Sequence, residues 1–107
     1  MKIREVWNSR IPKWLNVGAI TIYPFVFYEF PGPDSTLHRS WERETRRHEW
    51  IHIDQIRSYG FFSFYLSYFV YYLAGLIRFH NGELAYMEIP FEIEARESAK
   101  QPRQEYV

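Results

Sequence analysis

The chain has 107 residues, 13 basic and 13 acidic residues that balance to a formal net charge of zero, and no cysteine. This length predicts one domain, spanning residues 1–107, with a modest core. The balanced charge argues against a nucleic-acid partner recruited by bulk charge, and the lack of cysteine excludes disulfides and thiolate zinc ligands. Any zinc site would therefore use histidine and carboxylate ligands.

The first 30 residues predict a small sheet. No apolar stretch follows the charged start at Met1 to Arg4, so we expect no signal peptide and a cytoplasmic protein. Residues 1–16 predict a loop or a short strand. Residues 17–30 are rich in β-branched and aromatic side chains, which predicts two short antiparallel strands on either side of Pro24. The segment 31–34, Pro-Gly-Pro-Asp, predicts the end of the sheet.

A helix is predicted from Trp41 to Tyr59, with Ser40 as its N-cap and Gly60 as its end. It contains the pattern H-E-x-x-H at residues 48–52. Because residues four apart share one helix face, both imidazoles would point toward the same position. Zinc accepts two histidines in this arrangement, and the neighbouring Glu49 could take a proton from a water held there. The residues expected on the inward face are Trp41, Thr45, His48, His52, Gln55 and Tyr59. An exposed helix with two surface histidines is the alternative.

Residues 61–77 are apolar on all sides and reach the lower length limit of a membrane span. Arg57 and Arg78 flank the segment, and its tyrosines could lie at membrane interfaces. Four tyrosines and two serines also suit a helix buried inside the domain. The composition of the segment supports the two interpretations equally.

The C-terminal part would have to supply a third zinc ligand. Residues 80–82, His-Asn-Gly, predict a turn, and residues 88–100 predict a second helix that Pro90 opens. The candidate ligands in this part are His80, Glu83, Glu88, Glu92, Glu94 and Glu97. The residues alone leave the choice among them open.

The sequence His48-Glu49-x-x-His52-x-x-Gln55, followed later by Glu92-Ile93-Glu94-Ala95, resembles the zincin metallopeptidases. It is most similar to the gluzincins, in which a glutamate on a second helix, in an E-x-x-A setting, is the third ligand. The resemblance implies Glu92 as that ligand, and the small Ala95 would let the two helices approach closely. Arg96 stands where the family has an aspartate, so one contact around the site is missing or replaced.

The resemblance implies a minimal zincin with an α+β fold. Its parts are a small antiparallel sheet or hairpin, an active-site helix, a buried apolar helix and a C-terminal glutamate helix. A single membrane span over residues 61–77 would separate His52 from Glu92 by roughly 30 Å, whereas zinc holds its ligands at about 2 Å. We therefore expect this segment to be a buried or interfacial helix that returns the chain. Because so small a domain cannot cover it on every side, a homodimer contact or a membrane-surface contact through 61–77 is a secondary expectation.

The implied roles follow from the resemblance. The metal ligands are His48, His52 and Glu92. Glu49 is the general base acting on a zinc-bound water, and Tyr86 is the first candidate to stabilise the developing oxyanion, with His80 as the second. Gln55 and Glu94 either orient a histidine or are ordinary helix residues. The strand before the helix could bind an extended peptide at its edge.

The sequence thus predicts a zinc-dependent peptidase that hydrolyses peptide or protein substrates through a metal-activated water. Two alternatives stay open. One is a catalytically inactive zinc-binding scaffold, and the other is a small membrane protein with a chance motif. Substitution of Glu49 separates a peptidase from a scaffold, and solubility without detergent separates both from a membrane protein.

Overall fold

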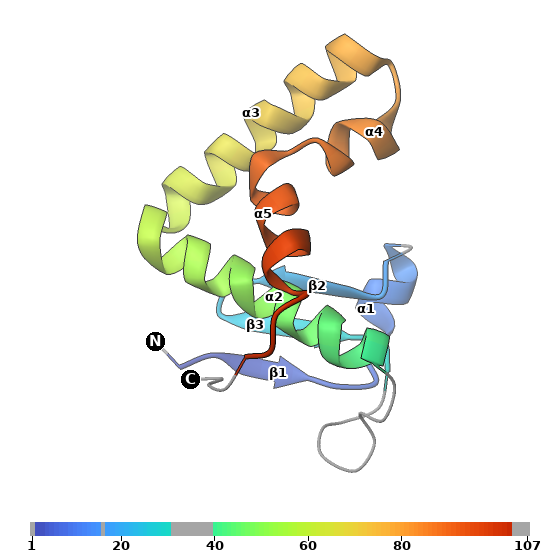
Figure 1. Ribbon diagram of the computed structural model, residues 1–107, viewed down its shortest axis with the longest axis vertical. Coiled ribbons are helices and arrows are strands. Elements are labelled where there is room, and N and C mark those ends of the chain that lie inside the picture. Colours follow the sequence, from blue (N-terminus) through green and yellow to red (C-terminus); the bar gives the residue numbers. More distant parts are fainter. Residues whose placement is uncertain (1, 16, 31–39, 104–107) are drawn as a thin grey trace.

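The computed structural model describes residues 2–15, 17–30 and 40–103. They form a small mixed α+β fold of three strands and five helices, which confirms the predicted fold class at that level. The elements in chain order are β1 (Arg4–Val6), α1 (Arg10–Trp14), β2 (Ala19–Ile22), β3 (Phe25–Tyr28), α2 (Ser40–Tyr59), α3 (Phe61–Phe79), α4 (Gly82–Met87) and α5 (Pro90–Ser98). Helix α2 crosses one face of the sheet, and α3 and α4 project away from it as an arm (Figure 1).

The sheet has the strand order β1-β3-β2. Strands β2 and β3 form the predicted antiparallel hairpin, with Ile22 opposite Phe25 and a cis peptide bond between Tyr23 and Pro24 in the turn. Strand β1 runs parallel to β3, so the prediction of an antiparallel sheet is wrong for the third strand. The parallel pairing needs a crossover, which α1 and β2 provide. A three-residue strand is too short for its sequence to indicate the direction of pairing. The segment 31–34 predicted to end the sheet lies outside the described residues.

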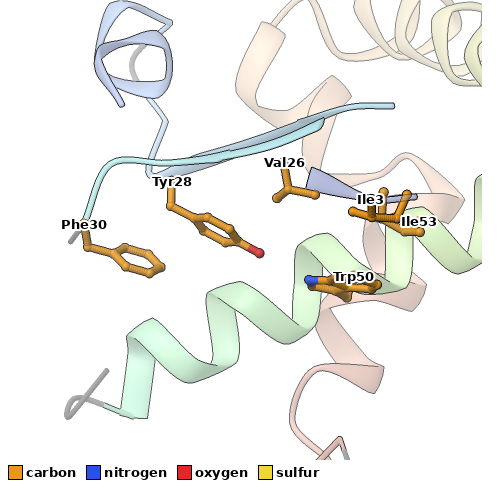
Figure 2. Close-up of a cluster of buried hydrophobic side chains, with 6 residues drawn as sticks. All are labelled: Ile3, Val26, Tyr28, Phe30, Trp50 and Ile53. Carbon is orange, nitrogen blue, oxygen red and sulfur yellow. The ribbon is translucent and has the colours of Figure 1, made fainter. Parts of the chain in front are cut away.

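A hydrophobic cluster fills the space between the sheet and α2. Its buried members are Ile3, Val26, Tyr28, Phe30, Trp50 and Ile53 (Figure 2). Glu5 of β1 adds a polar anchor, because its carboxylate accepts hydrogen bonds from Arg46 at 2.9 and 2.7 Å, from Trp50 at 2.6 Å and from Tyr28 at 2.8 Å. The anchor and the cluster fix the orientation of α2, the helix that carries both histidines of the motif.

Helix α2 ends as predicted, at Gly60, which has a φ of 90° and separates α2 from α3. The two helices bend by 115° at this residue. Ser40 is the first residue of α2, and its side chain lies outside the described residues. The predicted inward face is wrong at both ends, because Trp41 and Tyr59 are exposed. A helix of 20 residues is about 30 Å long, whereas a four-residue strand spans about 13 Å, so the sheet covers only the middle of α2.

Residues 61–77 are predicted to form a buried or interfacial helix, and the buried alternative is wrong. Only Phe64 and Gly75 of α3 are buried, because its neighbours cover a single face. The chain does return along α3, since α4 packs back onto it so closely that a Cβ at Gly75 would lie 2.8 Å from the Cα of Ala85. No single helix in the described ranges is long and apolar enough to span a membrane, whereas α2 and α3 together, bent at Gly60, have the length and composition of a broken span.

The predicted turn at residues 80–82 joins α3 to a helix that the sequence did not predict. His80 adopts the left-handed conformation that ends α3, and the Asn81 side chain caps α4 by accepting from the backbone N–H of Glu83 and Leu84. Helix α5 begins at Pro90, within the helix predicted over 88–100. The end of α4 is tied to α5, because Arg96 donates to the carbonyl of Met87 at 2.7 Å.

Candidate metal centre

Helices α2 and α5 pack together and place the three residues implied as metal ligands side by side. His48 Nε2 lies 2.9 Å from Glu92 Oε1. His52 Nε2 lies between both carboxylate oxygens of Glu92, 3.2 Å from Oε1 and 3.1 Å from Oε2. Ala95, one turn after Glu92, is fully buried, so its small side chain allows this close approach. The structure brings these residues together, and zinc binding stays a prediction.

The donor set fits a tetrahedral metal ion. Zinc ligand bonds of about 2.1 Å place neighbouring donor atoms about 3.4 Å apart. The nitrogen-to-oxygen distances of 2.9 to 3.2 Å between the two imidazoles and Glu92 are already close to that value. Within the described part of the chain, His48, Glu49 and His52 also each offer a donor atom within 4.8 Å of the others. Glu92 Oε1 therefore lies at about donor spacing from each of two imidazole nitrogens, and zinc accepts both kinds of ligand.

A hydrogen-bonded chain behind His52 fixes the orientation of its ring. The Gln55 amide nitrogen donates to the Phe91 carbonyl at 3.0 Å and to Glu94 Oε1 at 2.7 Å. Because both of these partners are acceptors, the Gln55 carbonyl oxygen must face His52 Nδ1, 2.8 Å away. Nδ1 then carries a proton, and Nε2 of the neutral ring offers its lone pair to a metal. Gln55 thus has the orienting position that the sequence left open, and Glu94 acts through it.

Glu49 is buried beside the two histidines and is held from the opposite side by the sheet. The Thr21 hydroxyl of β2 donates to Glu49 Oε1 at 2.8 Å. This bond fixes one carboxylate oxygen and leaves the other available to a water near the metal position. The sequence did not indicate Thr21, because a single threonine in a strand has no pattern that distinguishes it from its neighbours.

Two tyrosines from the arm donate hydrogen bonds to Glu92. Tyr68 of α3 reaches Oε2 at 2.6 Å, and Tyr86 of α4 reaches Oε1 at 3.2 Å. Burial and then the charge of Glu92 raise the pKa of both phenols, so both keep their protons at neutral pH. Tyr86 lies next to the Glu92 oxygen that contacts both histidines, and its role at the oxyanion stays a prediction. Tyr68 was missed, because it is one of four tyrosines in an apolar segment.

Tyr65 of α3 holds the outer edge of β2. Its hydroxyl donates to the Thr21 carbonyl at 3.2 Å and accepts from the Tyr23 backbone N–H at 3.1 Å. The Thr21 carbonyl therefore points away from β3. Because backbone groups two residues apart face the same edge of an antiparallel strand, those of Ala19 point the same way. The strand before α2 is β3, which lies between β1 and β2, so the predicted edge addition of a peptide is wrong for that strand. On this side of the sheet the free edge is the part of β2 before Thr21.

The cleft has two compartments that meet at Glu49 and Tyr86. One is a largely apolar cavity of about 200 Å³ under the arm, whose lining includes Ile20, Phe64 and Tyr68. The other is a more open hollow of about 460 Å³ beside Trp41, Glu44 and His48. Ala19 lines both compartments, so the free edge of β2 runs past the candidate metal position from one to the other.

The protonation of the centre is set by the pairing of His52 with Glu92. Burial alone lowers the pKa of His52, but the hydrogen bond to Glu92 and the charges of Glu49 and Glu92 outweigh it and raise the pKa to about 9. Burial likewise raises the pKa of Glu92, but the hydrogen bonds of His48 and His52 hold it well below its usual range. In the metal-free protein His52 is therefore protonated at neutral pH.

Metal binding is expected to displace this proton. Because the folded pKa of His52 lies above its ordinary value of 6.5, its contribution to the free energy of unfolding of the metal-free protein is complete below about pH 6.5. This contribution is lost as the pH rises through about 9. Zinc affinity should show the opposite trend and rise about tenfold per pH unit over the same range, since one proton is released.

Calorimetric titration with zinc at pH 7 in buffers of different ionisation enthalpy measures this proton. Release of no proton would contradict the assignment, and His80→Ala, at the tip of the arm, is the control expected to match the wild type.

The remaining candidates from the sequence lie away from this centre. His80 lies in the turn at the end of the arm, Glu83 and Glu88 are exposed on α4 and at its end, and Glu97 pairs with Lys100. Arg96, at the family's aspartate position, contacts α4 and leaves the histidines to other partners. Glu94 is exposed on α5 and also accepts a hydrogen bond from Gln55, which favours the orienting position among the two alternatives that the sequence left open.

Comparisons of the chain with models of protein families, with curated proteins and with solved structures find no match. The functional assignment therefore depends on the residues of this centre and on their geometry.

Proposed function

We propose that this chain is a zinc-dependent peptidase of minimal gluzincin type. The observation that carries the proposal is that Glu92 Oε1 lies 2.9 Å from His48 Nε2 and 3.2 Å from His52 Nε2, with a Glu49 donor atom within 4.8 Å of donor atoms of both histidines. Three protein ligands with a fourth position left to water are typical of catalytic rather than structural zinc sites. The free edge of β2 past this centre supports a peptide as the substrate.

The chain's own residues have distinct roles in this mechanism. When bound, zinc would supply a water of lowered pKa and polarise the scissile carbonyl. Glu49, oriented by Thr21, accepts a proton from that water and returns it to the leaving amine. Tyr86 keeps its phenolic proton and would turn its O–H from Glu92 to donate a hydrogen bond to the oxyanion. Tyr68 and Gln55 hold Glu92 and His52 in place.

One observation favours a second candidate, a non-catalytic module in which the same cluster serves only packing. Among the described residues, every buried side-chain nitrogen or oxygen has a hydrogen-bond partner without a metal. A protonated His52 paired with Glu92 would satisfy the centre by itself. A metal centre predicts that one zinc binds per chain and raises thermal stability. The packing cluster predicts neither result.

The experiment that tests the proposal compares zinc-loaded and metal-free protein on a mixture of unfolded polypeptides, with mass spectrometry to identify new termini. The expected result is cleavage by the zinc-loaded protein, loss of cleavage after chelation and its return with added zinc. Stoichiometric zinc with no new termini would leave the inactive scaffold as the function. No zinc binding at all would favour the packing cluster.

A further inference from the structure

The outward face of α3 is apolar, opposite to the face that packs on the rest of the molecule. Its exposed residues are Phe62, Leu66, Phe69, Val70, Leu73 and Ile77, which we call the α3 stripe. Their spacing of one, three or four residues places them on one side of the helix. Phe62, Leu66 and Ile77 are 84%, 66% and 76% exposed. A surface helix in contact with water carries polar residues on this side, so the stripe is suited to an apolar surface.

The charges around the stripe indicate which surface this is. Arg78 is the one charged residue within α3, and Arg57 precedes the helix at the end of α2. No acidic residue occurs in the sequence between Arg57 and Glu83. An apolar stripe with basic residues before and near its end is complementary to acyl chains beneath anionic phosphate groups. Arginine side chains can reach the headgroups while their stems lie along the apolar surface.

A second copy of the chain fits the stripe less well. From Phe62 to Ile77 the helix rises about 22 Å, so the stripe is one narrow row of six side chains on a single helix. A stable protein interface buries about 800 Å² of accessible surface on each partner and draws on about 20–30 residues a side, several times the number in the stripe. The arm projects away from the sheet (Figure 1), so the rest of the molecule would add little to a contact made by the stripe. A membrane surface has no such minimum area, because each apolar side chain adds its own transfer free energy.

We propose that the chain binds peripherally to anionic membrane surfaces through the α3 stripe. The opposite face of α3 places Phe64, Tyr65 and Tyr68 in the lining of the cleft. A stripe embedded in the membrane interface therefore holds the cleft about one helix diameter, roughly 10 Å, from the lipid. The binding uses no residue of the candidate metal centre and is independent of the proposed peptidase activity.

Sedimentation of the full chain with vesicles tests this proposal. The vesicles are phosphatidylcholine alone or with about one-third phosphatidylglycerol. The wild type is expected to bind both, and the anionic vesicles more tightly. Replacing Phe62, Leu66 and Ile77 together by serine should weaken binding to either by about 100-fold or more, because three exposed apolar side chains are lost. Arg78→Gln should weaken binding about fivefold, on the anionic vesicles only.

The matched control is Trp14→Ser on α1, which removes an apolar side chain that is 89% exposed and lies outside the stripe. It should bind vesicles as the wild type does. Circular dichroism should show unchanged folding in every variant, because the replaced side chains are exposed. Absence of wild-type binding, unchanged binding by the triple variant, or equal loss in Trp14→Ser would each overturn the proposal. A lipid-free dimer, seen by light scattering and dissociated by the triple variant, would assign the stripe to a second copy instead.

Discussion

Replacing Glu49 by glutamine is expected to abolish peptide hydrolysis while the protein retains its zinc. The substitution keeps the size of the side chain and its oxygen toward Thr21, but an amide cannot accept the proton of the attacking water. Turnover should fall by roughly 100- to 10,000-fold, the usual contribution of general acid–base catalysis. Rates measured on any peptide that the wild type cleaves, together with zinc content, give the result.

A matched control for this variant is Glu97→Gln, which removes the same charge from an exposed position on α5. Its turnover and zinc content should equal those of the wild type. Full turnover by Glu49→Gln would exclude Glu49 as the base. Loss of zinc from Glu49→Gln would instead place its carboxylate among the ligands, which the donor distances of His48, Glu49 and His52 also permit.

The second large effect is expected at Glu92. Glu92→Gln should weaken zinc binding by more than about 100-fold, because the neutral amide is a poor ligand and no longer balances the metal charge. Glu94→Gln should weaken it by at most about tenfold, since Glu94 acts on His52 only through Gln55. Zinc titration of both variants in the presence of a competing chelator measures the two affinities.

The comparison between these two glutamates is informative because they are two residues apart on one helix. Such residues point about 200° away from each other, so only one can face α2 directly. Zinc lost from Glu94→Gln and retained by Glu92→Gln would mean that α5 is rotated from the orientation described here. Wild-type affinity in both variants would remove α5 from the metal centre.

Local patterns allowed the sequence to predict part of the centre. The spacing of His48 and His52 places both on one face of any helix, and a helix here was predicted with the right end at Gly60. Glu92 required the resemblance to a family, since six residues were candidates. The structure agrees with the choice to the extent that it places Glu92 against both histidines.

The partners of the centre could not be predicted, because they depend on packing. These partners come from distant segments: Thr21 precedes Glu49 by 28 residues, and Tyr65 and Tyr68 follow His52 by 13 and 16 residues. None of the three stands out in its own segment. The apolar composition of residues 61–77 supported a membrane span and a buried helix equally, because composition does not show how many neighbours will cover a helix. The inward face of α3 completes the cleft, and its outward face remains exposed.

The most direct test of the account is the metal content of the chain, purified without chelator and without a polyhistidine tag and measured by elemental analysis. We expect one zinc per chain, and none in the variant that combines His48→Ala with His52→Ala. A matched variant, His80→Ala, should keep its zinc, because His80 lies in the turn between α3 and α4. A wild-type protein without metal that takes up none from added zinc, or full zinc occupancy in the double variant, would contradict the account.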